Sequence, residues 1–464
     1  MSMKVIPVMF FIIMSCIGEP ETARSTGPAS PQNTRFVKVM GAANPQEAFA
    51  IIQARDGSFV ILGITTNYGT GGNNLKGQHD VFLVKFSSSG SMVWARTLGK
   101  QNAFDIGLGL VECSDGGFLL TGVTDGFGAG KEDILVSKFD ENGDHQWSKT
   151  IGGSNDERGF SLVQAADGSY ILVGRTFSFG AGDADLLIVK LDSSGNPLWT
   201  KSLGGKLADF GSYYGPSLIL TSDSKILVAG STINSAGSSE DALLCKLDLD
   251  GNLIWARTIG GSASDIANSV FEMKDGTYML VGATYSFGEG ENDALMSKFR
   301  ADGTHIGTKT LGGASVAFAR ARTVVRSTGG GYAIGGNSAS LGSINQAFFV
   351  SKFDDEDTLL WTSKLSLGDP AKTKNITKAF LQSSDGGYLI TGETVQPYMP
   401  RIPLVKLDSE GNSCLGSRIS LKLEDQKLLA SPSSITIVNQ NPRVQPANPT
   451  IKSITPAIAT QCEN

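Results

Sequence analysis

The sequence predicts an all-β fold made of seven repeated units, and two observations lead to this prediction. The first is an anchor of the form W-x-K/R-T/S-L/I-G, which reads W-A-R-T-L-G at Trp94 and W-S-K-T-I-G at Trp147. Its copies begin at Phe36, Trp94, Trp147, Trp199, Trp255, Gly307 and Trp361, with a degenerate eighth at Leu415. The copies follow one another at steps of 52 to 58 residues, and a fixed period of this size indicates a repeat architecture.

The second observation is that each period contains short β-prone runs and no sustained helical periodicity. In the unit from Asp156 to Leu203 the four runs are Phe160–Gln164, Tyr170–Gly174, Asp185–Leu191 and Pro197–Leu203. Gly-containing turns such as Asp167-Gly168 separate them. Four short strands joined by such turns form one antiparallel sheet, so each period predicts one four-stranded blade.

Seven sheets can cover one another's faces when they pack radially, which predicts a seven-bladed β-propeller. The chain begins with an unpaired fourth strand at Arg35–Met40 and ends with three strands at Ile376–Gln382, Tyr388–Gly392 and Ile402–Leu407. We therefore expect the N-terminal strand to pair in the last blade and remove a free sheet edge. Ile419–Leu423 is the competing candidate for that place, although it fits the anchor poorly.

The charge balance is mildly acidic, with 39 basic and 45 acidic residues among 464. Nucleic acid is therefore not an expected partner, because neutralising phosphates requires a basic surface. Lysines recur at one position of the third strand, and we expect their stems to cover apolar surface while their ammonium groups stay in water. They are Lys85, Lys138, Lys190, Lys246, Lys298, Lys352 and Lys406.

The N-terminus has the pattern of a targeting segment. Lys4 precedes an apolar run from Val5 to Met14, which is too short to span a bilayer and suits a signal peptide. The following Ser15-Cys16 resembles the end of a bacterial lipobox, which implies cleavage before Cys16 and lipidation of its thiol. We expect a membrane-anchored protein of the cell envelope, in the outer membrane, and a monomer. An ordinary secretory signal with an incidental cysteine is the alternative.

We divide the chain into a signal peptide (1–15), a lipidated flexible tether (16–33), the propeller (34–415) and a Ser/Pro/Asn-rich tail (416–464). Cys113 and Cys245 fall inside strands and are interpreted as small buried side chains. Cys414 and Cys462 flank the tail, and an exported protein can oxidise such a pair. A disulfide between them and two unpaired thiols both remain open.

Two further motifs accompany the anchor: D-G-G-Y/F-x-L/I-x-G, as from Asp115 to Gly122, and D-x-L-L-x-K-x-D from Asp241 to Asp248. Together they resemble the repeats of bacterial cell-envelope lipoproteins built as seven-bladed β-propellers. The resemblance covers Arg35 to Leu415. It implies the fold and leaves the activity open, because one fold hosts many functions.

Acidic residues precede the first strand of several repeats, at Asp105, Asp156, Asp209 and Asp265. They are candidates for an acidic arc at one mouth of the propeller, attractive to cations or basic groups. Capping of the preceding loop is the structural alternative. No calcium-loop motif accompanies any acidic turn, so neither a metal nor another cofactor is expected.

In the predicted propeller the long, variable loops lie together on one face, and four of them carry an aromatic residue. Tyr68, Phe127, Phe179 and Phe287 are therefore candidates for a ligand face, with packing beneath their own glycine-rich loops as the alternative. No G-x-S-x-G elbow and no H-E-x-x-H motif occurs. We expect a non-catalytic module that binds an envelope or extracellular protein or glycan. The alternatives are a hydrolase or lyase using the acidic mouth, and a structural surface protein without a specific ligand.

Overall fold

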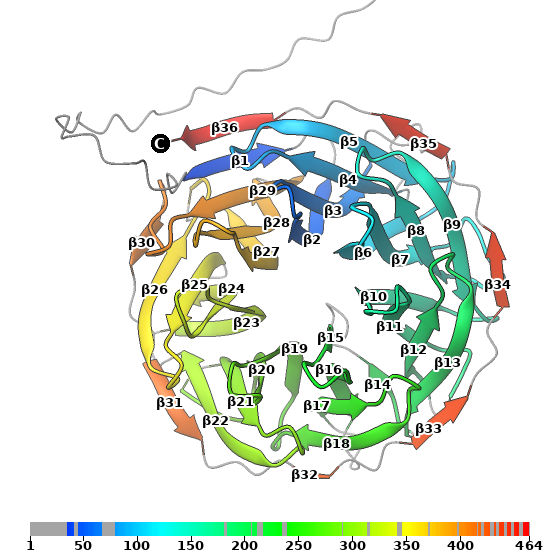
Figure 1. The fold of residues 1–464 in the computed structure, drawn as a ribbon. Helices are drawn as coiled ribbons and strands as arrows, with labels where there is room; N and C mark the ends of the chain where they lie inside the picture. Colours follow the sequence, from blue (N-terminus) through cyan, green and yellow to red (C-terminus); the bar gives the residue numbers. More distant parts are fainter. Residues whose placement is uncertain are drawn as a thin grey trace, which may run out of the picture.

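The computed structural model shows seven blades arranged around a central axis (Figure 1). It describes residues 35–40, 45–66, 79–180, 183–205, 207–210, 217–233, 239–289, 291–312, 316–340, 346–369, 372–396, 399–414 and seven short strands of the tail. The prediction of an all-β, seven-bladed propeller with four antiparallel strands in each blade is confirmed. No helix long and apolar enough to cross a membrane occurs in the described ranges.

Each blade is a sheet whose strands follow the chain outward from the axis. Blade one contains β2 (Gln46–Gln53), β3 (Phe59–Thr65), β4 (Asp80–Phe86) and β5 (Met92–Gly99). Blade two contains β6 (Asp105–Glu112), β7 (Phe118–Thr124), β8 (Asp133–Phe139) and β9 (His145–Gly152). Blade three contains β10 (Glu157–Gln164), β11 (Tyr170–Thr176), β12 (Asp185–Leu191) and β13 (Pro197–Gly204). In blade four, β14 (Asp209–Phe210) and β15 (Ser217–Leu220) share the first position, beside β16 (Ile226–Ile233), β17 (Glu240–Leu247) and β18 (Leu253–Ile259).

The remaining blades repeat this order. Blade five contains β19 (Asp265–Glu272), β20 (Tyr278–Thr284), β21 (Asp293–Phe299) and β22 (His305–Gly312). Blade six contains β23 (Val316–Arg326), β24 (Tyr332–Ser340), β25 (Ala347–Phe353) and β26 (Leu359–Leu365). Blade seven contains β27 (Lys374–Gln382), β28 (Tyr388–Gln396), β29 (Met399–Leu407) and β1 (Phe36–Met40). β1 pairs antiparallel with β29, from Phe36 opposite Lys406 to Met40 opposite Ile402. The predicted closure by the N-terminal strand is therefore confirmed.

The hydrophobic core lies between the blades. Seven clusters of buried side chains each draw on two neighbouring blades, and the first of them joins Phe36 and Leu404 of blade seven to Phe59 and Phe82 of blade one. The second and third strands are apolar along most of their length, because both faces of a blade pack against another sheet.

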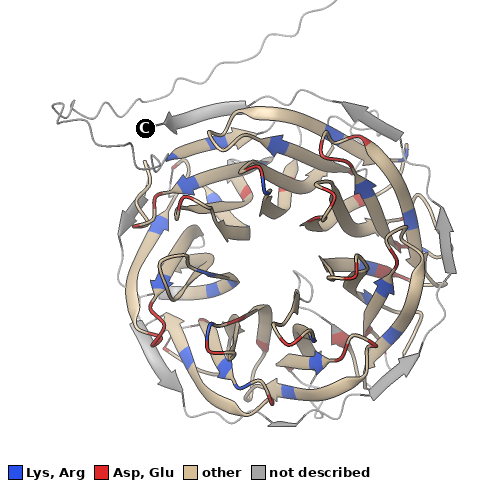
Figure 2. Ribbon diagram, in the orientation of Figure 1, with Lys and Arg blue, Asp and Glu red and all other residues tan. Residues whose placement is uncertain are grey.

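The recurrent lysines do not place their ammonium groups in water, so that expectation is wrong. Lys85, Lys138, Lys190 and Lys246 are buried, and each Nζ lies 2.8 to 3.4 Å from an aspartate of the β-turn in its own blade. Lys406 pairs in the same way with Asp385. Figure 2 shows Lys and Arg residues on many of the strands and Asp and Glu residues in many of the turns. Each pair ties a third strand to the turn that precedes the second strand.

The tail forms a belt around the outside of the propeller, which we call the C-terminal belt (Figure 1). Its strands pair antiparallel with the outer strands of blades six, five, four, three, two, one and seven, in that order. They are β30 (Gly416–Arg418), β31 (Lys422–Gln426), β32 (Ser431–Pro432), β33 (Thr436–Asn439), β34 (Arg443–Pro446), β35 (Thr450–Ser453) and β36 (Ile458–Glu463). Each blade thereby gains a fifth strand, which covers an edge that would otherwise be open.

Both ends of the C-terminal belt lie near the seventh blade. Cys414 is disulfide-bonded and packs against the core cluster of the sixth and seventh blades, while Cys113 and Cys245 are buried free thiols. Cys462 is the register partner of Val37 in β1. The side chain of Cys462 lies outside the described residues, so the Cys414–Cys462 bond stays a prediction.

Candidate functional site

Buried acidic side chains occupy the start of the first strands, on the face that carries the long loops. Asp105, Asp209 and Asp265 are at most 2% exposed. Asp105 Oδ2 accepts a hydrogen bond of 2.9 Å from the Lys100 amide, and Asp265 Oδ2 accepts one of 2.8 Å from the Gly261 amide. Each carboxylate therefore caps the loop that enters its own blade.

In the third blade the residue at this position is Glu157, and Asp156 lies outside the set. Glu157 is fully buried, its Oε2 accepts a hydrogen bond of 2.6 Å from the Gly153 amide, and its Oε1 accepts one of 2.8 Å from the Thr176 hydroxyl. Asp156 is partly exposed, and its carbonyl accepts from the Phe177 amide. The placement of Asp156 with Asp105, Asp209 and Asp265 is thus wrong by one residue, which in a strand reverses the direction of the side chain.

Burial shifts the protonation of these acids. It raises the pKa of the Asp105 carboxyl to about 6, against hydrogen bonds from Thr124 and Lys100 that favour the charged form. Burial likewise raises the pKa of Asp209 and Asp265. The result is a set of loop-capping carboxyls whose ionisation is costly, and not an open acidic mouth.

The predicted aromatic residues pack against their own surroundings. Phe127 is half-buried with Lys100 Nζ 5.2 Å from its ring centre, and Phe179 packs on the core cluster of blades two and three. A methyl group on Gly261 would come within 2.7 Å of the Phe287 ring, so that ring lies on a glycine of the preceding loop. Tyr68 lies outside the described residues, as does Cys16.

Two other aromatic residues of this face are exposed, and the sequence reasoning missed both. Phe177 and Tyr285 are each 41% exposed, two positions before Phe179 and Phe287 respectively. All four residues lie in bends after β11 and β20, where the regular alternation of a strand no longer holds, so no periodic pattern of the sequence separates the exposed ring from the buried one.

A cleft of about 460 Å³ lies beside Tyr285, between the fourth and fifth blades. Its walls are Ser239 and Glu240 at the start of β17, the loop Ser262–Ser264, Ile266 of β19 and Tyr285 after β20. This volume falls in the range of ligand-binding pockets, and the walls combine hydroxyl groups, one carboxyl group and one aromatic ring.

Glu240 is the titratable group of this cleft. Burial raises the pKa of its carboxyl above the usual value. The equivalent residue of the second blade, Glu132, forms a two-pronged ion pair with Arg158 of the next blade, with Nε–Oε2 at 2.5 Å and Nη2–Oε1 at 2.8 Å. At the position of that arginine the fifth blade has Ile266, so an apolar side chain replaces the guanidinium beside Glu240.

Two further carboxyl groups lie next to the cleft. Burial, followed by the charge of Asp265, raises the pKa of Asp241 to about 6. Asp265 Oδ2 also accepts a hydrogen bond of 2.6 Å from the Ser286 hydroxyl. Among the described residues no group of three or more His, Cys, Asp or Glu side chains is placed to hold a metal ion.

Such an arrangement can carry proton transfer. A carboxyl group whose pKa is raised by burial keeps its proton closer to neutral pH and can deliver it to a bound oxygen. The exposed ring of Tyr285 and the nearby serine hydroxyls provide an apolar face with polar edges, which is the kind of surface that a sugar ring matches.

Comparison with known proteins gives one match to a family model. The model described as "Domain of unknown function (DUF5122) beta-propeller" matches residues 221–253, which lie in the fourth blade. The regulatory protein FlaEY of Caulobacter vibrioides is 27% identical over 213 residues, which covers 39% of this chain and 22% of that protein. The chain thus spans about a fifth of the length of that relative.

Several solved structures are similar in fold. The Penicillium chrysogenum alpha-L-arabinanase has a TM-score of 0.37 and 11% identity over 66% of this chain and 94% of its own. The NanB sialidase of Streptococcus pneumoniae has a TM-score of 0.42 and 10% identity over 83% and 70%. The Synechocystis apocarotenoid oxygenase has a TM-score of 0.43 and 12% identity over 88% and 96%. At these identities the likeness concerns the fold alone.

The expectation of a non-catalytic binding or scaffolding module, and of a chain that is not an enzyme, is withdrawn. Solved propellers of similar fold include an arabinanase and a sialidase, so the fold itself does not exclude catalysis. The missing motifs belong to other folds, so their absence does not exclude it either. A propeller can assemble a site from single residues of neighbouring blades, as at Glu240 and Tyr285, which no linear motif reports.

Proposed function

We propose that the chain is a hydrolase that cleaves a glycosidic bond in the cleft between the fourth and fifth blades, with Glu240 as the proton donor. The observation that carries this proposal is a carboxyl group of raised pKa in a cleft of ligand size, beside an exposed aromatic ring. At the equivalent position of the second blade, Glu132 is instead ion-paired with Arg158.

The proposed reaction uses Glu240 as a general acid. Its carboxyl proton passes to the oxygen of the leaving group as the bond from that oxygen to the anomeric carbon breaks. A water molecule supplies the hydroxyl group to the anomeric carbon and releases its other proton to the solvent. Asp241 follows Glu240 in β17, so its side chain points to the opposite face of the strand and takes no part in this step.

The test is a screen of oligosaccharides with detection of new reducing ends, followed by Glu240→Gln on any substrate that is cleaved. We expect Glu240→Gln to lower kcat by about 10²-fold or more, because it removes the transferable proton and keeps the size of the side chain. The matched control is Glu132→Gln, which should leave the rate within about twofold. Equal rates for wild type and Glu240→Gln would exclude this site.

For its location, we propose a lipid-anchored protein of the cell envelope with Cys16 as the lipidated residue. The support is the sequence pattern from Lys4 to Cys16. Labelling with an alkyne fatty acid in the producing bacterium should mark the wild type and not Cys16→Ala. Labelling that persists in Cys16→Ala would contradict the proposal.

A further inference from the structure

At six of the seven blade junctions, an aromatic ring of one blade packs on a glycine of the next. The ring comes from the fourth strand, and the glycine lies in the turn between the third and fourth strands of the following blade. A methyl group added to these glycines would come within 2.3 to 3.1 Å of the ring. The pairs are Phe36 with Gly90, Trp94 with Gly143, Trp147 with Gly195, Trp199 with Gly251, Trp255 with Gly303, and Trp361 with Gly411.

At the junction between the fifth and sixth blades, both the ring and the glycine are replaced by other residues. Gly307 stands where the other blades have the ring, and no atom lies within 4 Å of a methyl group placed on it. Asp357 stands where the others have glycine, and it keeps the left-handed conformation of that glycine, with φ of 63°. Asp357 Oδ2 lies 3.2 Å from Lys298 Nζ and Oδ1 accepts a hydrogen bond of 3.0 Å from the Tyr332 hydroxyl.

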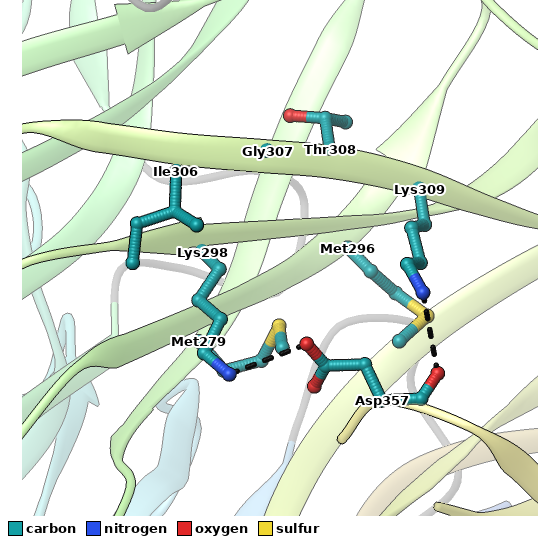
Figure 3. A pocket seen from close by; sticks show the side chains of 8 residues that line it. All are labelled: Met279, Met296, Lys298, Ile306, Gly307, Thr308, Lys309 and Asp357. Atoms are coloured by element: carbon teal, nitrogen blue, oxygen red, sulfur yellow. Dashed lines mark hydrogen bonds and ion pairs between the residues drawn. The ribbon is translucent and has the colours of Figure 1, made fainter. Parts of the chain in front are cut away.

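A cavity of about 330 Å³ results at this junction (Figure 3). Met279, Met296 and Ile306 supply its apolar lining, and Lys309 and Asp357 its polar side. Ile306 is 47% exposed, so the cavity opens at the surface of the fifth blade. The volume lies at the lower end of the range for small-molecule sites.

The cavity lining contains the kinds of side chain that contact the tryptophan ring in the other blades. In four of them a cation two residues after the tryptophan lies 5.6 to 5.9 Å from its ring centre, and Lys309 is the residue at that position here. Methionine sulfur atoms also make favourable contacts with aromatic rings. Met296 is the register partner of Lys309 in the neighbouring strand, and Met279 lies one strand further along the same sheet.

In two other blades, the N–H of the tryptophan ring also donates a hydrogen bond to a main-chain carbonyl of the next blade. Trp199 Nε1 donates to the Leu249 carbonyl at 3.2 Å, and Trp255 Nε1 donates to the Ala301 carbonyl at 3.1 Å. Both carbonyls occupy the second position of the next blade's turn. Asp355 holds that position in the sixth blade.

We propose that this cavity binds a small planar aromatic molecule of the indole class. The ring packs over the two methionines beside Lys309, and its N–H donates to the main-chain carbonyl of Asp355. The site is separate from the cleft at Glu240, so it does not depend on the proposed hydrolysis.

Indole itself is the probe, titrated into the full chain by calorimetry. We expect one equivalent to bind with a Kd of about 1 mM or tighter. Gly307→Trp supplies the ring from the chain, so it should weaken binding at least tenfold. Trp147→Gly opens a second junction of the same kind, so it should raise the stoichiometry to two. No binding to the wild type, or equal binding to Gly307→Trp, overturns the proposal.

A second measurement detects binding in the wild type and uses two conservative variants only to assign signals. With 13C-labelled methionine methyl groups, bound indole should give nuclear Overhauser contacts to the Met279 and Met296 methyls, assigned by Met279→Leu and Met296→Leu. Contacts at these two methyls support the site. Binding that perturbs only methyl groups elsewhere overturns it.

Discussion

Val37, in the first strand of the chain, is the antiparallel register partner of Val405 in β29. Two hydrogen bonds between Gln53 and Ser384 also join blades one and seven, at 3.1 and 2.7 Å. The ring is therefore closed by residues from the two ends of the propeller sequence, and every blade has a neighbour on both sides.

Closure predicts a large effect at Val37, which is fully buried. Val37→Asp places an unpaired charge in the core between the sixth and seventh blades and should lower the free energy of unfolding by about 3–5 kcal/mol. Urea unfolding followed by tryptophan fluorescence measures it. Val93→Asp is the control, because Val93 is 56% exposed and should cost less than about 0.5 kcal/mol. Equal losses in both variants would contradict closure through β1.

The ring-on-glycine contact predicts a difference between two glycines of the third blade. Gly195 (φ 77°) and Gly168 (φ 82°) share the left-handed conformation, but only Gly195 lies under a ring, that of Trp147. Gly168→Ala should cost about 1 kcal/mol from the backbone alone, and Gly195→Ala a further 1–3 kcal/mol from overpacking. Thermal and urea unfolding compare them. Equal costs would show that the ring moves aside freely.

Asp105 predicts a pH dependence of stability. Its pKa is about 6 in the fold and near 3.8 in the unfolded chain, so its contribution is fully present below pH 3.8 and is lost as pH rises through 6. Asp105→Asn should remove that loss, a gain of about 2–3 kcal/mol at pH 7 relative to pH 4. The chain itself places Asn375 and Gln46 at equivalent positions, so an amide is tolerated there. Parallel pH profiles for the two proteins, measured by urea unfolding, would contradict this.

Removing the C-terminal belt should expose seven sheet edges. A chain ending at Leu415 is expected to self-associate, because each outer strand regains unpaired backbone groups. Light scattering after size exclusion, and amide exchange in β9 and β13, compare it with the full chain, both carrying Cys414→Ser. A monomeric truncated chain with unchanged exchange would contradict the pairing.

The sequence predicted the blades and their closure because the anchor repeats at a near-constant step and four β-prone runs fill each period. The C-terminal belt was not predicted, since its strands have two to six residues and pair through backbone groups, which requires no pattern of side chains. The lysine–aspartate pairs left a usable signal: Lys138 and Lys246 each follow their aspartate by 23 residues.

The candidate site could be predicted only in part. The acids of the first strands were found, but a shift of one residue exchanged Glu157 for Asp156. Glu240 was missed because its environment depends on Ile266 in the next blade, and no local pattern tells an ion-paired glutamate such as Glu132 from one in an apolar cleft.

The role of Glu240 as proton donor is tested most directly by the leaving group. Once a cleaved glycan is known, Glu240→Gln is compared with wild type on aryl glycosides of the same sugar that differ in the acidity of the phenol. An acidic phenol needs no proton, so the variant should keep near wild-type rates on it and lose about 10²-fold or more on the least acidic phenol. An equal loss on every substrate, or no loss on any, would contradict the assignment.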